Sequence, residues 1–211
     1  MLTGTYKPTK GKIYFYNKEI NGKGVDRITS LGIARTFQNI RLFSDMSVLD
    51  NVKVGVHVHI RSSVWKAIAH WPSYLDEEKN IHKRAIDLLK IVHLENLKEH
   101  LAGSLPYGEQ RRLEIARALA TSPKLLLLDE PAAGMNPQES KDLMKFIKEI
   151  QNKFELTIIL IEHDMKVVMG ICKRILVLDY GITIAEGNPT EIQNNPEVIK
   201  AYLGVEATSY A

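Results

Sequence analysis

The sequence predicts an α/β fold with a mostly parallel sheet flanked by helices. Four short aliphatic or β-branched segments are each followed at once by polar residues, a pattern typical of strands buried on both faces of a parallel sheet. These segments are residues 33–37, 125–128, 157–161 and 175–178. The longer stretches between them carry apolar residues at helical spacing, and strands that alternate with helices indicate this fold class.

The elements follow in order along the chain. Residues 48–120 contain no convincing strand, so we interpret them as a helical subdomain between two sheet strands. We expect its aromatic stretch 65–72 to serve local packing, and a surface for docking is the alternative. Residues 121–211 hold the later strands of the core. Pro137 predicts the start of a helix, and Gly181 predicts a tight turn between two final short strands.

Composition fits one globular domain over residues 1–211, because 45% of the residues are hydrophobic and 25% are charged. The net charge of +3 comes from dispersed Lys and Arg, which argues against a nucleic-acid partner. The single cysteine, Cys172, excludes an intrachain disulfide and favours a reducing compartment. No apolar run approaches the ~20 residues that span a bilayer. Any membrane role is therefore expected to act through a partner.

Polar side chains follow three of the predicted strands. Gln38 follows the first, Asp129 and Glu130 follow the second, and Glu162 and His163 follow the third. Because ligands gather at the carboxyl ends of parallel strands, these residues predict one site. Asp129 suits a Mg²⁺ ligand, and Glu130 suits the base for a water that attacks a γ-phosphoryl group. His163 is expected to stabilise charge on that group, and Gln38 to order the metal and the water.

A glycine-containing turn opens the helix that begins near residue 107. Such a turn presents free backbone N–H groups and the positive end of the helix dipole, which suits a phosphate. The candidate residues for binding the nucleotide here are Leu105, Pro106, Tyr107, Gly108, Glu109 and Gln110.

Together these motifs resemble the ATP-binding-cassette family over almost the whole chain. Residues 125–131, Leu-Leu-Leu-Leu-Asp-Glu-Pro, are similar to the Walker B motif, and residues 105–110 to the family signature. Gln38 matches the Q-loop and His163 the switch histidine. Residues 132–137 resemble the D-loop, which adds Gly134 and Asn136 to the residues expected near the nucleotide.

The resemblance implies a P-loop NTPase-like core that binds ATP and Mg²⁺ and hydrolyses ATP. It implies two kinds of partner, a second ABC ATPase subunit and transmembrane permease subunits. It also implies a cytoplasmic location, peripheral on the cytoplasmic face of the cell membrane. In this reading Glu130, His163 and Gln38 are catalytic, and Asp129 and Gln38 serve the metal.

Residues 32–43, 162–170 and 201–204 look like those of branched-chain amino-acid importers. Lipopolysaccharide-exporter ATPases share much of this pattern and remain the sub-family alternative. ATPases of DNA repair and chromosome structure share the motifs but carry long coiled-coil insertions, and this chain has none.

The sequence departs from the family in one large respect, because no Gly-x-x-x-x-Gly-Lys-Ser/Thr occurs in it. Residues 3–13 resemble the stretch that follows this phosphate loop and its helix, so we expect the first strands, the loop and most of that helix to be missing. Two smaller departures are Pro106 in place of a common serine and Asn136 in place of a common aspartate. The missing loop leaves a second hypothesis, a nucleotide-independent binding module or non-functional fragment that docks on a transporter.

Overall fold

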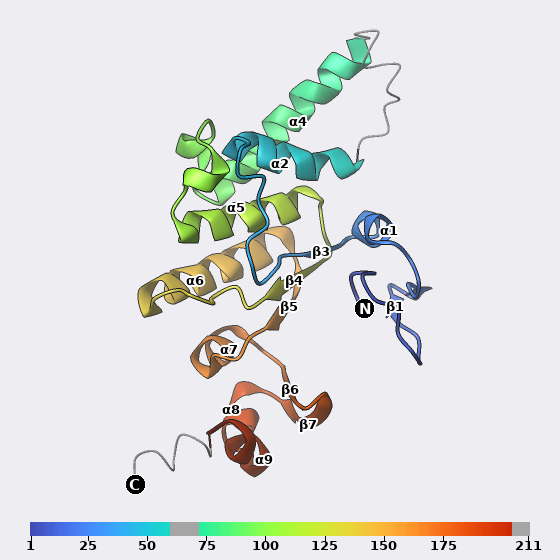
Figure 1. Ribbon diagram of the computed structural model, residues 1–211, viewed down its shortest axis with the longest axis vertical. Helices are drawn as coiled ribbons and strands as arrows, with labels where there is room; N and C mark the ends of the chain where they lie inside the picture. Colours follow the sequence, from blue (N-terminus) through green and yellow to red (C-terminus); the bar gives the residue numbers. More distant parts are fainter. Residues whose placement is uncertain (60–71, 204–211) are drawn as a thin grey trace.

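The computed structural model describes residues 1–59 and 72–203 (Figure 1). Residues 65–71 of the predicted aromatic stretch lie outside these ranges. So does residue 204, the last of the segment 201–204 that resembles branched-chain amino-acid importers. The strands are β1 (Tyr14–Phe15), β2 (Lys18–Glu19), β3 (Ile33–Arg35), β4 (Leu125–Asp129), β5 (Thr157–Ile161), β6 (Ile175–Asp179) and β7 (Ile182–Gly187). The α-helices are α1 (Val25–Ser30), α2 (Val48–Val56), α4 (Pro72–Ile91), α5 (Tyr107–Ala120), α6 (Pro137–Phe154), α7 (Met165–Ile171), α8 (Pro189–Gln193) and α9 (Pro196–Val198). Shorter turns are η1 (His57–His59), η2 (Glu95–Leu97), η3 (Ala102–Ser104) and the π-helical η4 (Ile199–Leu203).

The central sheet is parallel and has the order β3-β4-β5, which confirms the predicted α/β class. Its aliphatic middle strand β4 is buried through Leu128. In the register, Leu125 pairs with Ile33 on one side and with Thr157 on the other. The carboxyl ends of the three strands therefore lie at one edge of the sheet, where the predicted polar residues follow.

The last two strands, β6 and β7, form an antiparallel hairpin. Gly181 lies in its predicted turn, and its φ of 80° is in the left-handed region that favours glycine. The prediction that strands 157–161 and 175–178 are buried on both faces of a parallel sheet is wrong. Ile161 on β5 and Leu176 on β6 are more than half exposed. The exposed positions alternate along each strand, at residues 157, 159 and 161 of β5 and at residues 176 and 178 of β6. One face of each strand is therefore left uncovered by the described residues.

Helices α2, α4 and α5 gather at one end of the molecule (Figure 1) and bury a shared apolar cluster. The close packing of α2 on α5 depends on Gly55, because a Cβ atom there would lie 2.4 Å from the carbonyl oxygen of Arg117. In the described part of 48–120 the structure has helices and no strand element. That this region is a separate subdomain stays a prediction.

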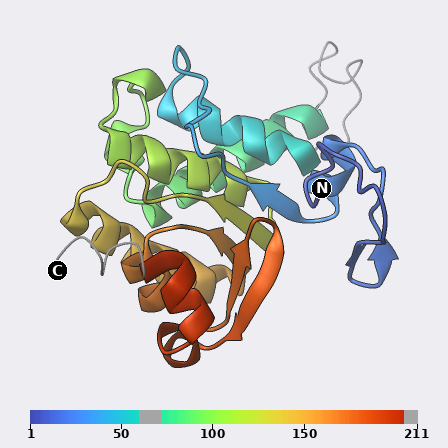
Figure 2. The ribbon, with the colours of Figure 1, turned by 60° about the horizontal axis from the view of Figure 1, so that its bottom comes forward.

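Figure 2 shows α8 and α9 lying against the β6–β7 hairpin. Each begins with an asparagine cap followed by proline, as α6 does at the predicted Pro137. Val198 and Ile192 fill the small apolar cluster beneath them. Among the helices described, none has the length and apolar character needed to cross a bilayer.

Candidate functional site

Three of the predicted catalytic residues converge at the carboxyl ends of β3, β4 and β5. The side-chain amide of Gln38 donates a hydrogen bond of 2.8 Å to Glu130 Oε2. The other carboxylate oxygen of Glu130, Oε1, lies 3.7 Å from Nδ1 of His163. Glu130 thus stands between an amide and an imidazole that come from different strand ends.

The backbone at Glu130 holds this acid in an unusual conformation. Its φ is 41°, in the left-handed region that few residues other than glycine adopt. Its N–H nevertheless donates to the carbonyl of Ile161 over 2.9 Å, which continues the β4–β5 ladder by one residue. Strained backbone of this kind clusters at functional sites.

Asp129, the predicted metal ligand, ends β4 beside Glu130 but contacts a different partner. Its Oδ2 accepts from Arg35 Nη2 over 2.5 Å in a partly buried ion pair. Mg²⁺ binds one or two protein carboxylates and keeps several waters, so the free oxygen of Asp129 and the amide oxygen of Gln38 suit it chemically. Within the described residues there is no cluster of three or more His, Cys, Asp or Glu that could hold a metal.

Glu162, which the sequence placed at the end of β5 without a role, supports the turn after Glu130. Its Oε1 accepts from the N–H of Ala132 over 3.0 Å. The side chain therefore ties the end of β5 to the segment that carries the predicted D-loop.

The predicted signature residues lie at the start of α5. Pro106 is the residue before the helix, and among the described residues no side chain caps this terminus. Leu105 is buried in the core, and Gln110 donates to the carbonyl of Leu105 over 2.8 Å. The hydroxyl of Tyr107 donates to Ala133. Among the residues that the structure describes, no hydrogen bond or ion pair joins these side chains directly to Asp129 or Glu130.

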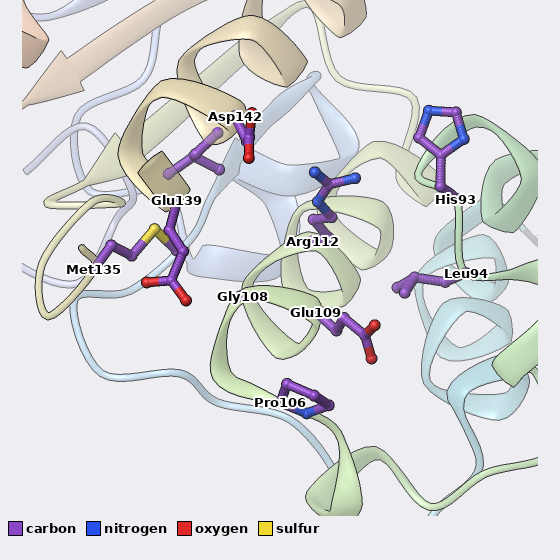
Figure 3. A pocket seen from close by; sticks show the side chains of 10 residues that line it. His93, Leu94, Pro106, Gly108, Glu109, Arg112, Met135, Glu139 and Asp142 are labelled. Atoms are coloured by element: carbon purple, nitrogen blue, oxygen red, sulfur yellow. The ribbon is translucent and has the colours of Figure 1, made fainter. Parts of the chain in front are cut away.

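A hollow of about 380 Å³ lies beside this turn, between α5, α6 and the loop after α4 (Figure 3). Pro106, Gly108 and Glu109 line one wall, and Glu139 of α6 faces them across the hollow. A Cβ atom at Gly108 would meet no atom within 4 Å. The surface at the signature turn is therefore open to a molecule from outside this chain.

The D-loop residues precede α6. Gly134 has a φ of 77°, so glycine meets a backbone requirement there. The side chain of Asn136 accepts from the N–H groups of Gln138 and Glu139. The carboxylate of Glu139 in turn accepts from the backbone N–H of Asn136, which completes a capping box. The structure thus uses Asn136 as a helix cap, while its contact with a nucleotide stays a prediction.

A second hollow, of about 680 Å³, lies between β3, the loop that follows it, α1, α2 and α5. Its rim carries exposed apolar side chains, among them Phe43, Val54 and Val58. Sequence reasoning missed this groove because its walls come from segments far apart in the chain.

Two family profiles match the chain. The ABC transporter profile matches residues 1–133, and a profile described as branched-chain amino acid ATP-binding cassette transporter matches residues 183–208. The chain is 44% identical over 203 residues to the high-affinity branched-chain amino acid transport ATP-binding protein LivG of Escherichia coli (strain K12), and the match covers 96% of this chain and 80% of LivG.

Solved structures of ATP-binding cassettes have the same fold. The ADP conformation of MJ1267, an ATP-binding cassette of an ABC transporter, superposes with a TM-score of 0.80 at 30% identity and covers 96% of this chain and 80% of that one. The dimeric structure of MJ0796, a bacterial ABC transporter cassette, gives a TM-score of 0.71 at 26% identity and covers 89% and 77% of the two chains.

Proposed function

Because this chain belongs to the ATP-binding-cassette (ABC) transporter family, we propose that it is the subunit that binds and hydrolyses ATP to drive transport of branched-chain amino acids. The contact between Gln38 and Glu130, beside His163, is the observation that carries the hydrolytic part. The transported substrate is proposed from the similarity to LivG and from the C-terminal profile.

In the proposed reaction Glu130 is the general base. Its carboxylate accepts a proton from the water that attacks the γ-phosphoryl group of ATP, and the amide of Gln38 keeps that carboxylate in one orientation. His163 is 72% exposed, so its imidazole is free to reach a phosphate brought to the crest of the sheet. Asp129 and Gln38 would hold Mg²⁺, which when bound neutralises charge on the phosphates.

We further propose that a second ABC ATPase subunit docks on the signature turn. The open space at Gly108 and the uncapped start of α5 leave room there for the phosphates of a nucleotide held by the other subunit. Residues 105–110, Gly134 and Asn136 would face that nucleotide. The dimeric relative MJ0796 supports this arrangement.

A transmembrane permease subunit is the second proposed partner. The groove lined by Phe43, Val54 and Val58 offers apolar side chains next to the loop that carries Gln38. An apolar segment of the permease in this groove would contact the loop that carries Gln38, and Gln38 contacts Glu130. Such docking would hold the chain on the cytoplasmic face of the membrane.

ATP binding and turnover test the proposal directly. Because the sequence contains no Gly-x-x-x-x-Gly-Lys-Ser/Thr, the purified chain is titrated with a fluorescent ATP analogue and Mg²⁺ beside a form in which a family phosphate loop precedes Leu2. We expect the form with the loop to bind and hydrolyse ATP. In that form Glu130→Gln should keep binding and lose about 10²–10⁴-fold in turnover, the usual range for a general base.

The exposed Glu149→Gln on α6 is the matched control, because it makes the same chemical change away from the sheet crest. Undiminished hydrolysis by Glu130→Gln would reject the base assignment. Equal binding by the form without the loop would show that nucleotide binding does not need the loop.

Membrane association tests the permease site. In cells that carry the permease subunits, Val58→Asp should release the chain from the membrane fraction, because a charge in an apolar interface is desolvated without a partner. Ile182→Asp, on the exposed β6–β7 hairpin, is the control and should stay bound. Retention of Val58→Asp would contradict docking at this groove.

A further inference from the structure

The loop that carries Gln38, residues 37–43, has no regular secondary structure, yet its backbone is held by side chains from α5. Arg111 donates from Nη1 to the carbonyl of Phe37 over 2.6 Å and from Nη2 to the carbonyl of Gln38 over 2.8 Å. The guanidinium of Arg111 thus binds the backbone carbonyls of both Phe37 and Gln38, and Gln38 is the residue whose side chain contacts Glu130.

The opposite charge on the same helix binds the N–H groups of this loop. Glu114 Oε1 accepts from the N–H of Phe37 over 3.4 Å and from the N–H of Arg41 over 3.3 Å. Its other oxygen, Oε2, accepts from Arg111 Nη1 over 2.8 Å. Arg111 is fully buried and Glu114 is 2% exposed, so the pair has no access to water.

Two further polar side chains complete the attachment. Arg117, three residues beyond Glu114, donates to the carbonyl of Arg41. Asn51 of α2, which is also fully buried, accepts from the N–H of Phe43 over 3.0 Å and donates to its carbonyl over 3.0 Å. Residues 111, 114 and 117 are spaced along one face of α5, and that face binds the loop.

Stability alone does not account for a buried ion pair at this place. Apolar residues of similar volume often serve as well or better, because both charges must leave water. The Nε atom of Arg111 is buried without a hydrogen-bond partner, which adds to the cost. The pair of Arg111 and Glu114 supplies directional hydrogen bonds to the backbone at residues 37, 38 and 41, which apolar side chains could not make.

We propose that Arg111 and Glu114 are positioning residues of the ATPase, which fix the loop 37–41 to α5 so that the amide of Gln38 stays on Glu130. A movement of α5 then shifts Gln38 with it, and the signature helix and the base respond together. The proposal rests on the proposed function, because Glu130 needs correct orientation only if it serves the reaction.

Amide hydrogen exchange in the purified chain tests the attachment without nucleotide. We compare Glu114→Gln and the double variant Arg111→Met/Glu114→Leu with the parent chain. The double variant removes both charges together and so avoids an unpaired buried charge that would unfold the protein. We expect the N–H groups of Phe37 and Arg41 to exchange about tenfold faster or more, the loss corresponding to a charge-assisted hydrogen bond.

The amides of β4 report whether the fold survives, and their exchange should stay unchanged. Arg112→Met is the matched control, because its guanidinium lies over the ring of Phe146 at 5.3 Å rather than on the loop. It should leave exchange at Phe37 and Arg41 as in the parent. Unchanged exchange at these two amides in the double variant would overturn the proposal.

Steady-state kinetics of the assembled ATPase, in the form that carries the phosphate loop, separates positioning from binding. The double variant should lose about tenfold or more in kcat with an unchanged KM for ATP, because the misplaced group acts in the transition state. If the parent is active and the double variant keeps its kcat, the positioning role is wrong while the proposed function stands. A parent without activity would overturn the proposed function and the positioning role with it.

Discussion

The side-chain amide of Gln38 and the carboxylate of Glu130 are hydrogen-bonded over 2.8 Å although 92 residues separate them in the sequence. Parallel pairing of β3 with β4 brings the two strand ends together, and the buried ion pair of α5 holds the loop on which Gln38 sits. The site therefore depends on the sheet for proximity and on α5 for orientation.

Replacing Gln38 by alanine removes the side-chain amide that donates to Glu130. In the form of the protein that hydrolyses ATP, Gln38→Ala should lower kcat about tenfold to a hundredfold, the range for a lost hydrogen bond to a charged group. Steady-state ATP hydrolysis checks this. The exposed neighbour Asn39→Ala is the control, and equal rates for the two variants would argue against a role for the amide.

Removing Arg35 leaves the carboxylate of Asp129 partly buried without its ion pair. Arg35→Met should cost on the order of 1–2 kcal/mol of stability in the absence of metal. Excess Mg²⁺ should restore much of the loss, because an ion that binds only the folded state stabilises it. Thermal melts with and without Mg²⁺ measure both effects.

Arg174→Met is the comparison for this experiment, since it breaks an exposed ion pair with Glu186 far from Asp129. Its melting temperature should not respond to Mg²⁺ any more than that of the parent. A loss in Arg35→Met that is the same with and without Mg²⁺ would speak against Asp129 as a metal ligand.

Asn136→Ala should destabilise the chain by about 1 kcal/mol, the usual cost of a lost helix cap. Urea unfolding measures it, and Asn136→Ser should recover most of the loss because serine also caps. If both variants hydrolyse ATP at the parent rate in the form with the phosphate loop, Asn136 serves the helix alone. A kcat loss that serine does not rescue would instead favour contact with the nucleotide.

The stability of α2 should depend on pH through Asp50. The hydroxyl of Ser47 donates to this carboxylate over 2.7 Å and lowers its pKa, and the charge of Lys53 acts in the same direction. Because the folded pKa lies below the unfolded value, the stabilisation is complete above about pH 4 and is lost as the pH falls through the folded pKa.

Melting temperatures of the parent and of Asp50→Asn should therefore differ near neutral pH and converge in acid. The exposed Asp45→Asn controls for the loss of one negative charge nearby. A difference between parent and Asp50→Asn that is constant down to strong acid would show that the carboxylate contributes through something other than its charge.

Much of the sheet could be predicted because aliphatic runs as dense as 125–128 rarely occur elsewhere than in buried strands. The strand ends at Arg35, two residues before the predicted end at Phe37. The N–H of Thr36 still donates to Leu127 of β4, but at Phe37 the backbone binds Arg111 of α5 instead. The surroundings of residues 175–178 could not be predicted, since the same aliphatic pattern fits a buried parallel strand and a half-exposed hairpin.

The site shows the same division. Gln38, Glu130 and His163 were predictable because polar residues directly after apolar strands share one edge of a parallel sheet. Arg111 and Glu114 were not, because charges three residues apart on a helix read as a solvated face. Their partners lie 73 to 77 residues earlier in the chain, and only the folded structure brings them together.

The left-handed backbone at Glu130 has a consequence for protein engineering. A residue such as glutamate costs about 1 kcal/mol or more in that region, whereas glycine and asparagine tolerate it, so either of them at position 130 should make the chain more resistant to heat. A library screened for thermal stability alone would therefore enrich variants that have lost the proposed base. Directed evolution of a sturdier form has to hold position 130 constant and gain its stability elsewhere.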